Sequence, residues 1–256
     1  MSGWVLAAAM AVAAAAVLGS LAILKDRQVR GLRKRLAAAA LELERLQDTC
    51  SRFAPPAVLE RLINEEGDVA AERKVVTALF ADLVGYSALS NQLEPAALAR
   101  VLNGYFQRVS DAITEHHGYV STFLGDGILA YFGALEPNPW QCNDAARAAI
   151  AMRAALSAYN EELVRERLPR LAIGVGLHRG AGLAGMIGSR ERREYAFVGR
   201  TVNLAARVQA LTREHKVDIL LTEDVRKELD PSFRLRAMPP AEVKGFKGAV
   251  ATFALL

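Results

Sequence analysis

The chain has few of the residues that build disulfide-rich or zinc-binding proteins. Its 256 residues include only two cysteines, Cys50 and Cys142, which are too few for a disulfide framework. Neither a CxxC nor an HExxH pattern occurs, and the four histidines are scattered. We therefore expect neither a disulfide scaffold nor a structural zinc domain.

A strong charge imbalance is also absent. The net charge is only +4, and much of it comes from one short basic cluster. The cluster comprises Lys25, Arg27, Arg30, Arg33, Lys34 and Arg35. No basic stripe interleaved with aromatic residues occurs elsewhere, so nucleic acid is not an expected partner. An apolar share of 52% predicts a folded core, and 256 residues allow one domain of ordinary size with appendages.

The N-terminal segment 4–24 contains no charged residue over 21 positions. That length is sufficient to span a hydrocarbon core, and Trp4 lies where an interfacial aromatic is expected. A cleaved signal peptide, the alternative, carries its basic residues before the apolar run, whereas here they follow it. We expect a single-pass transmembrane helix within residues 1–25. The positive-inside rule then places the rest of the chain in the cytoplasm, at the inner membrane.

Residues 26–54 combine the basic juxtamembrane cluster with a heptad pattern. Apolar residues recur at alternating spacings of four and three, at Leu32, Leu36, Ala39, Leu43, Leu46, Cys50 and Phe53. The pattern favours a short parallel coiled coil, and the alternative is one amphipathic helix lying on the membrane or on the following domain. Pro55 and Pro56 end this helix, and residues 55–72 are predicted to be a linker.

From residue 73 to residue 256 the pattern alternates strands with helices. We predict strands over 75–81, 119–124, 128–132, 171–178, 182–187, 217–221 and 250–256. We predict helices over 94–117, 141–166, 201–211 and 223–229. The order βαββαβ, followed by additions, is typical of an α+β domain of the ferredoxin-like, split-βαβ type.

Two aspartates each lie at the end of an apolar run in this region. Asp82 follows a predicted buried strand, and Asp126 lies in a Gly-Asp-Gly hairpin tip. Each alone is explained equally well by a helix cap or a turn. Two carboxylates presented side by side suit Mg²⁺ or Mn²⁺ and substrate phosphates. Asn203 and Arg207, four residues apart on one helix face, add the polar groups needed for chemistry on a nucleoside triphosphate.

The order of these motifs resembles the catalytic domain of class III nucleotidyl cyclases, the adenylate and guanylate cyclase family. The resemblance covers residues 73–256 and rests on several segments in the family's order. They are FADLVGY at 80–86, LGDG at 124–127, IGS at 187–189, YAFVGRTVNLAAR at 195–207 and EVKG at 242–245. Each segment alone is short, and their joint order and context carry the resemblance.

The resemblance implies a reaction and a metal site. The ribose 3′-hydroxyl attacks the α-phosphorus, pyrophosphate leaves, and a 3′,5′-cyclic nucleotide forms. Asp82, the adjacent Leu83, and Asp126 are the expected ligands of two Mg²⁺ or Mn²⁺ ions. One ion lowers the pKa of the attacking hydroxyl, and the other binds the triphosphate.

The resemblance also implies the residues that hold the substrate. Asn203 positions the ribose, Arg207 neutralises charge on the α-phosphoryl oxygens, and Lys244 holds the terminal phosphates, with Lys247 as the near alternative. The backbone N–H groups of Val84, Gly85 and Tyr86 are expected to cradle phosphate oxygens. Gly125 and Val198 complete the expected substrate-binding set.

Base selection is where the sequence departs from the family's pattern. Adenylate cyclases usually carry a lysine where this chain has Thr122, and an aspartate or threonine where it has Ala196. Guanylate cyclases carry glutamate and cysteine there. Adenylate cyclase activity is the expected function, and cyclisation of a pyrimidine nucleotide or of GTP is the alternative. A catalytically silent membrane dimerisation scaffold is the non-enzyme alternative.

The resemblance implies a site shared between two subunits of a head-to-tail homodimer. The metal carboxylates come from one subunit and the Asn/Arg pair from the other, and this chain carries both sets. We expect the heptads to align the dimer, and we expect a membrane protein or the lipid state to act as regulator through them.

Overall fold

The computed structural model describes Met10, Lys25, Val58 and the residues 28–46, 71–189, 193–246 and 248–256. The chain divides into two units, Met1–Leu59 and Glu60–Leu256. Each unit is described by itself.

In the first unit, residues 28–46 are helical, which agrees with the helix predicted from the heptads. Four of the predicted seam leucines, Leu32, Leu36, Leu43 and Leu46, expose 56–73% of their surface. Ala39, a further seam position, is exposed on the same helix, whereas Cys50 and Phe53 lie outside the described residues, as does the linker up to residue 70 except for Val58.

The predicted transmembrane segment 4–24 also lies outside the described residues, apart from Met10. Among the helices that the structure does describe, none has both the length and the apolar character needed to cross a membrane.

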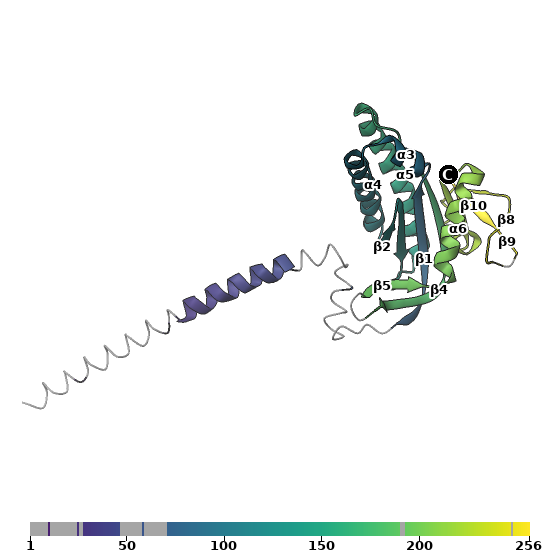
Figure 1. Ribbon diagram of the computed structural model, residues 1–256. Coiled ribbons are helices and arrows are strands. Elements are labelled where there is room, and N and C mark those ends of the chain that lie inside the picture. Colours follow the sequence, from purple (N-terminus) through teal and green to yellow (C-terminus); the bar gives the residue numbers. More distant parts are fainter. Residues whose placement is uncertain are drawn as a thin grey trace, which may run out of the picture. The chain divides into compact units, whose positions relative to one another are not determined.

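The second unit is built on one mixed sheet (Figure 1). Its strands are β1 (Glu72–Leu83), β2 (Gly118–Leu124), β3 (Gly127–Phe132), β4 (Ile173–Gly188), β5 (Arg193–Val198), β6 (Ile219–Thr222), β7 (Leu235–Ala237) and β10 (Thr252–Leu255). They lie in the order β2-β3-β1-β4-β6-β10-β7, with β5 paired to β4. A separate two-stranded sheet joins β8 (Ala241–Glu242) to β9 (Ala249–Val250).

The helices are α3 (Tyr86–Gln92), α4 (Pro95–Glu115), α5 (Gln141–Arg165), α6 (Arg200–His215) and α7 (Glu223–Arg226). The first four strands are antiparallel neighbours in the order β2-β3-β1-β4. This is the arrangement of a ferredoxin-like βαββαβ unit, so the predicted α+β fold class of the domain is confirmed.

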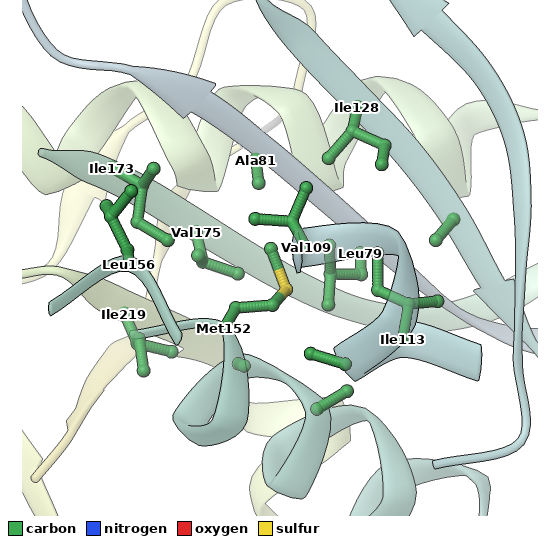
Figure 2. Close-up of a cluster of buried hydrophobic side chains, with 14 of the residues drawn as sticks. Leu79, Ala81, Val109, Ile113, Ile128, Met152, Leu156, Ile173, Val175 and Ile219 are labelled. Carbon is green, nitrogen blue, oxygen red and sulfur yellow. The ribbon is translucent and has the colours of Figure 1, made fainter. Parts of the chain in front are cut away.

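The main core lies between the sheet and helices α4 and α5 (Figure 2). Because strand side chains alternate between faces, Ile173, Val175 and Leu177 of β4 all point into this core. Val109 and Ile113 of α4 and Met152 and Leu156 of α5 meet them there. Helices α4 and α5 thus pack on the face of the sheet that carries these residues.

Helix α6 packs against the opposite face of β4, where two glycines make room for it. A Cβ at Gly176 would lie 2.5 Å from the carbonyl oxygen of Ala205, and one at Gly174 would overlap the Thr212 hydroxyl. Any side chain at either position would push the helix away from the sheet. The glycines therefore fix how closely α6 approaches β4 and the neighbouring β1.

The structure corrects two sequence predictions in this region. The segments 171–178 and 182–187 were predicted as two strands around a glycine-rich turn, but they form one strand, β4. The ladder runs through the glycines, because Gly180 pairs with Val76 and Gly182 with Lys74. Strand β5 and the short strands β7, β8 and β9 were not predicted, and β5 pairs with the far half of β4.

Candidate active site

Asp82 and Asp126 meet at one end of the sheet. Asp82 is the penultimate residue of β1, and Asp126 lies in the β2–β3 turn after Gly125, whose φ of +66° favours glycine. Pairing of Ala81 with Ile128 brings the start of β3 beside the end of β1. The two carboxylates that the sequence singled out are thus brought together.

The electrostatics of this pair favour a cation. Burial, a hydrogen bond to Asp126 and its charge raise the pKa of Asp82 to about 6, and the charge of Arg213 partly offsets this rise. Two carboxylates side by side repel each other when both are ionised. A divalent cation between them would remove that repulsion and lower the pKa of Asp82.

Tyr105 of α4 is buried below this pair. Its hydroxyl has no hydrogen-bond partner among the described residues, and burial together with the charges of Asp82 and Asp126 raises its pKa. A neutral tyrosine is therefore the species that faces the carboxylates from the core side.

The donor set suits a divalent cation such as Mg²⁺ or Mn²⁺. The two carboxylates and the Leu83 carbonyl are hard oxygen donors. Gly127 packs closely at the end of β1, since a Cβ there would lie 3.2 Å from the Leu124 carbonyl oxygen and 3.3 Å from that of Ala81. Within the described residues no group of three or more His, Cys, Asp and Glu side chains is arranged so that it could hold a metal ion by itself. Water and substrate phosphates would therefore supply the remaining ligands.

Arg213 of α6 contacts the same two ligand residues. Its Nη2 donates to Asp82 Oδ2 at 2.9 Å and to the Leu83 carbonyl oxygen at 3.1 Å. No sequence pattern predicted this contact. Arg213 lies outside the quoted motifs and reaches Asp82 only through the packing of α6 on the sheet.

Asn203, Arg207 and Lys244 line one cavity of about 320 Å³. Asn203 and Arg207 come from one face of α6, and Lys244 comes from the loop after β8. Arg200, which was not predicted, adds a third cation to this cavity, and its guanidinium lies 5.0 Å from the ring centre of Phe246. Three cations beside an amide suit a polyphosphate ligand.

Within one chain the two groups of residues stay apart. Neither Asp82 nor Asp126 lines the cavity of Asn203 and Arg207. Asp82 is held by Arg213, which lies ten residues, or roughly 15 Å along the helix, from Asn203. The chain therefore presents two separate parts of a site.

The predicted phosphate cradle is corrected at one position. The Val84 N–H donates to the Ala172 carbonyl oxygen at 2.8 Å, so this amide is already bonded within the sheet region. Gly85 lies in the left-handed region at φ +78° and precedes α3, which begins at Tyr86. The predicted phosphate contacts of Gly85 and Tyr86 remain predictions.

The two positions predicted to select the base lie on two strands. Thr122 is on β2 at a bulge after Val120, and its hydroxyl makes a long 3.4 Å hydrogen bond to the adjacent carbonyl of Phe123. Ala196 is on β5 opposite Gly185, and Val198, two residues further, is 53% exposed. Neither Thr122 nor Ala196 offers a charged group to a base.

Comparison with known proteins assigns the class. A sequence profile of the "Adenylate and Guanylate cyclase catalytic domain" matches residues 69–256. An adenylate cyclase of Anabaena cylindrica is 33% identical over 224 residues, covering 83% of this chain and 43% of that protein. The chain thus spans less than half the length of this relative.

Two solved structures share the fold. The adenylyl cyclase CyaB of P. aeruginosa superposes with a TM-score of 0.69 at 26% identity, covering 73% of this chain and 96% of that one. The guanylyl cyclase Cya2 superposes with a TM-score of 0.63 at 29% identity, covering 72% and 93%. The fold is that of a nucleotidyl cyclase catalytic domain. The chain belongs to the class III adenylate and guanylate cyclase family.

Asp126→Asn should change both pH stability and the response to metal. Because the pKa of Asp82 is raised to about 6, the metal-free protein should lose stability as the pH rises from about 4 to about 6, and the loss persists above that. Removing the Asp126 charge should make the metal-free variant more stable than wild type at pH 8. Allowing for partial exposure, we expect about 1 kcal/mol, or roughly 2–4 °C in Tm.

Thermal denaturation at pH 4 and pH 8, with and without Mn²⁺, measures both effects. The difference in Tm between the metal-free variant and wild type should vanish towards pH 4. Mn²⁺ should raise the Tm of wild type but not of the variant. Asp111→Asn, on the exposed surface of α4, is the control for loss of one negative charge. A metal-free wild type as stable as Asp126→Asn at pH 8 would contradict the repulsion between the carboxylates.

Proposed function

We propose that the chain is an adenylate cyclase that converts ATP to 3′,5′-cyclic AMP and pyrophosphate. The observation that carries this proposal is the cavity in which Asn203, Arg207 and Lys244 meet. A second group, Asp82 and Asp126, lies at the end of the sheet near the C-terminal part of α6. Together they provide a metal site and a polyphosphate site, as intramolecular phosphoryl transfer requires.

The chain's own residues bind and orient the nucleotide in this mechanism. Asn203 hydrogen-bonds the ribose and keeps its 3′-oxygen in line with the α-phosphorus. Arg207 donates to the α-phosphoryl oxygens, where charge grows in the transition state. Lys244, assisted by Arg200, holds the terminal phosphates and the departing pyrophosphate.

Asp82, the Leu83 carbonyl and Asp126 would hold the divalent ions, for which we propose two per site. When bound, the ions lower the pKa of the 3′-hydroxyl and neutralise the triphosphate.

The similarity to an adenylate cyclase of Anabaena cylindrica, which is 33% identical to this chain, supports ATP over the other nucleotides as the substrate. The solved structures include both an adenylyl and a guanylyl cyclase, so the fold does not select the base. With Thr122 and Ala196 at the usual base-reading positions, adenine would be read by backbone groups or by other side chains.

We propose that the working form is a head-to-tail homodimer. The separation of the carboxylates from the cavity of Asn203 within one chain supports it, because a second copy would bring the two parts together. The exposed leucines of the helix 28–46 support a parallel coiled coil that aligns the two copies.

We propose further that residues 4–24 anchor the chain in the inner membrane, with the catalytic domain in the cytoplasm. The support is the uncharged segment of 21 residues and the basic cluster that follows it. A membrane protein or the lipid state would regulate activity through the coiled coil.

The product test decides the substrate. The purified full chain is incubated with Mn²⁺ or Mg²⁺ and with ATP, GTP, CTP or UTP separately, and cyclic monophosphates are identified by mass spectrometry. We expect cyclic AMP from ATP, and a loss of at least about 100-fold in Asp126→Ala. A cyclic pyrimidine or cyclic GMP as the main product would reject the adenylate assignment. No product from any nucleotide would favour the scaffold.

Mixing two inactive variants tests the shared site. Asp126→Ala and Arg207→Ala should each be inactive, and together they should recover about a quarter of wild-type activity. Random exchange places half of the chains in mixed dimers, each with one intact site of two. Size-exclusion chromatography verifies that both variants still form dimers. Verified mixed dimers without activity would argue against a site built from two subunits.

Fractionation tests the anchor. The full chain should stay in the membrane pellet after a carbonate wash and be released by detergent, because a segment of 21 uncharged, mostly apolar residues is long enough to span the bilayer. A chain lacking residues 1–25 should appear in the supernatant and retain its fold by circular dichroism. Release of the full chain by carbonate alone would exclude the anchor.

A further inference from the structure

Arg213 lies where a metal ion is expected to bind. One guanidinium nitrogen, Nη2, donates both to Asp82 Oδ2, at 2.9 Å, and to the Leu83 carbonyl oxygen, at 3.1 Å. These are two of the three residues proposed to hold the divalent ions. A guanidinium nitrogen and a metal ion both need the lone pairs of these oxygens, so they compete for the same atoms.

The packing of α6 on the sheet determines the position of Arg213. Asp82 pairs with Gly174 across the β1–β4 ladder. Thr212, the residue before Arg213, lies directly over Gly174, where even a Cβ would overlap its hydroxyl. The close approach of α6 to the sheet therefore delivers the next residue, Arg213, to Asp82.

The contact is also easily reversed. The Arg213 side chain is 52% exposed, so it can swing into solvent without losing a buried environment. The Asp82 side chain is 25% exposed and faces Asp126. A half-exposed ion pair is weak enough for a divalent ion to displace.

We propose that Arg213 is a built-in counter-ion that holds Asp82 and the Leu83 carbonyl in the metal-free site and must leave when the divalent cation binds. The proposal rests on the proposed function, since it assumes that Asp82 and Leu83 are metal ligands. Arg213 is then a positioning residue that sets how much metal the site requires. Removing the Arg213 charge should lower the stability of the metal-free protein and raise the affinity of the site for the metal ion.

Mn²⁺ binding without nucleotide tests the proposal. Free Mn²⁺ is measured by electron paramagnetic resonance during titration of the full chain at low ionic strength. Arg213→Gln should lower the Kd for Mn²⁺ roughly two- to five-fold, the range expected for loss of one exposed ion pair. Arg213→Lys keeps the charge but not the planar donor, so its Kd for Mn²⁺ should lie between the values of wild type and Arg213→Gln. Raising the salt concentration should reduce the difference in Kd for Mn²⁺ between wild type and Arg213→Gln, because salt screens the ion pair.

Thermal denaturation gives a second readout. Metal-free Arg213→Gln should melt below wild type, because Asp82 then faces Asp126 without a counter-ion, and Mn²⁺ should raise its Tm more than that of wild type. Arg236→Gln is the matched control, since Arg236 is exposed on β7 at the far edge of the sheet. This control should bind Mn²⁺ as wild type does.

The outcomes separate this proposal from the proposed function. An unchanged or weaker Mn²⁺ affinity in Arg213→Gln, with cyclase activity present in wild type, would overturn the counter-ion role alone. Tighter Mn²⁺ binding in Arg213→Gln, with no cyclic nucleotide formed by wild type, would support the counter-ion role and reject the cyclase assignment. If neither protein binds Mn²⁺, there is no metal to compete for, and the counter-ion role is rejected.

Discussion

The pairing of β1 with β4 is the contact on which the rest of the domain depends. It runs without interruption from Glu72 opposite Ala184 to Leu83 opposite Ile173. One side of this ladder is packed by α4 and α5, and the other side, at Gly174 and Gly176, seats α6. The same ladder therefore places Asp82 at its end and determines how α6 presents its polar residues.

Much of this arrangement could be predicted from local sequence patterns. The apolar run before Asp82 and the Gly-Asp-Gly turn around Asp126 each fixed a strand end, and pairing of neighbouring strands brought them together. The four-residue spacing of Asn203 and Arg207 was sufficient to place both on one face of a helix. Strand ends and helix faces depend on residues close in sequence, so a local pattern is sufficient to predict them.

Contacts between distant segments could not be read in the same way. Gly180 was predicted to lie in a turn because glycine is common there, whereas it lies within one strand and passes close to the Thr201 side chain. Arg213 and Arg200 are ordinary helix residues in sequence. Only the depth of α6 on the sheet brings Arg213 to Asp82, and only the loop after β8 brings Phe246 to Arg200.

Under the proposed activity, backbone groups would read the base in place of the side chains usual at the positions of Thr122 and Ala196. Tyr119 and Tyr131 donate to the carbonyl oxygens of Tyr195 and Phe197, which flank Ala196, at 3.4 and 3.2 Å. These bonds hold β5 against the hairpin on both sides of the position that usually carries a base-reading side chain. Under the proposed activity, a strand fixed in this way presents its remaining backbone groups at a defined distance from the base. A fixed backbone donor or acceptor discriminates between bases without a charged side chain, because the wrong base would leave it unpaired.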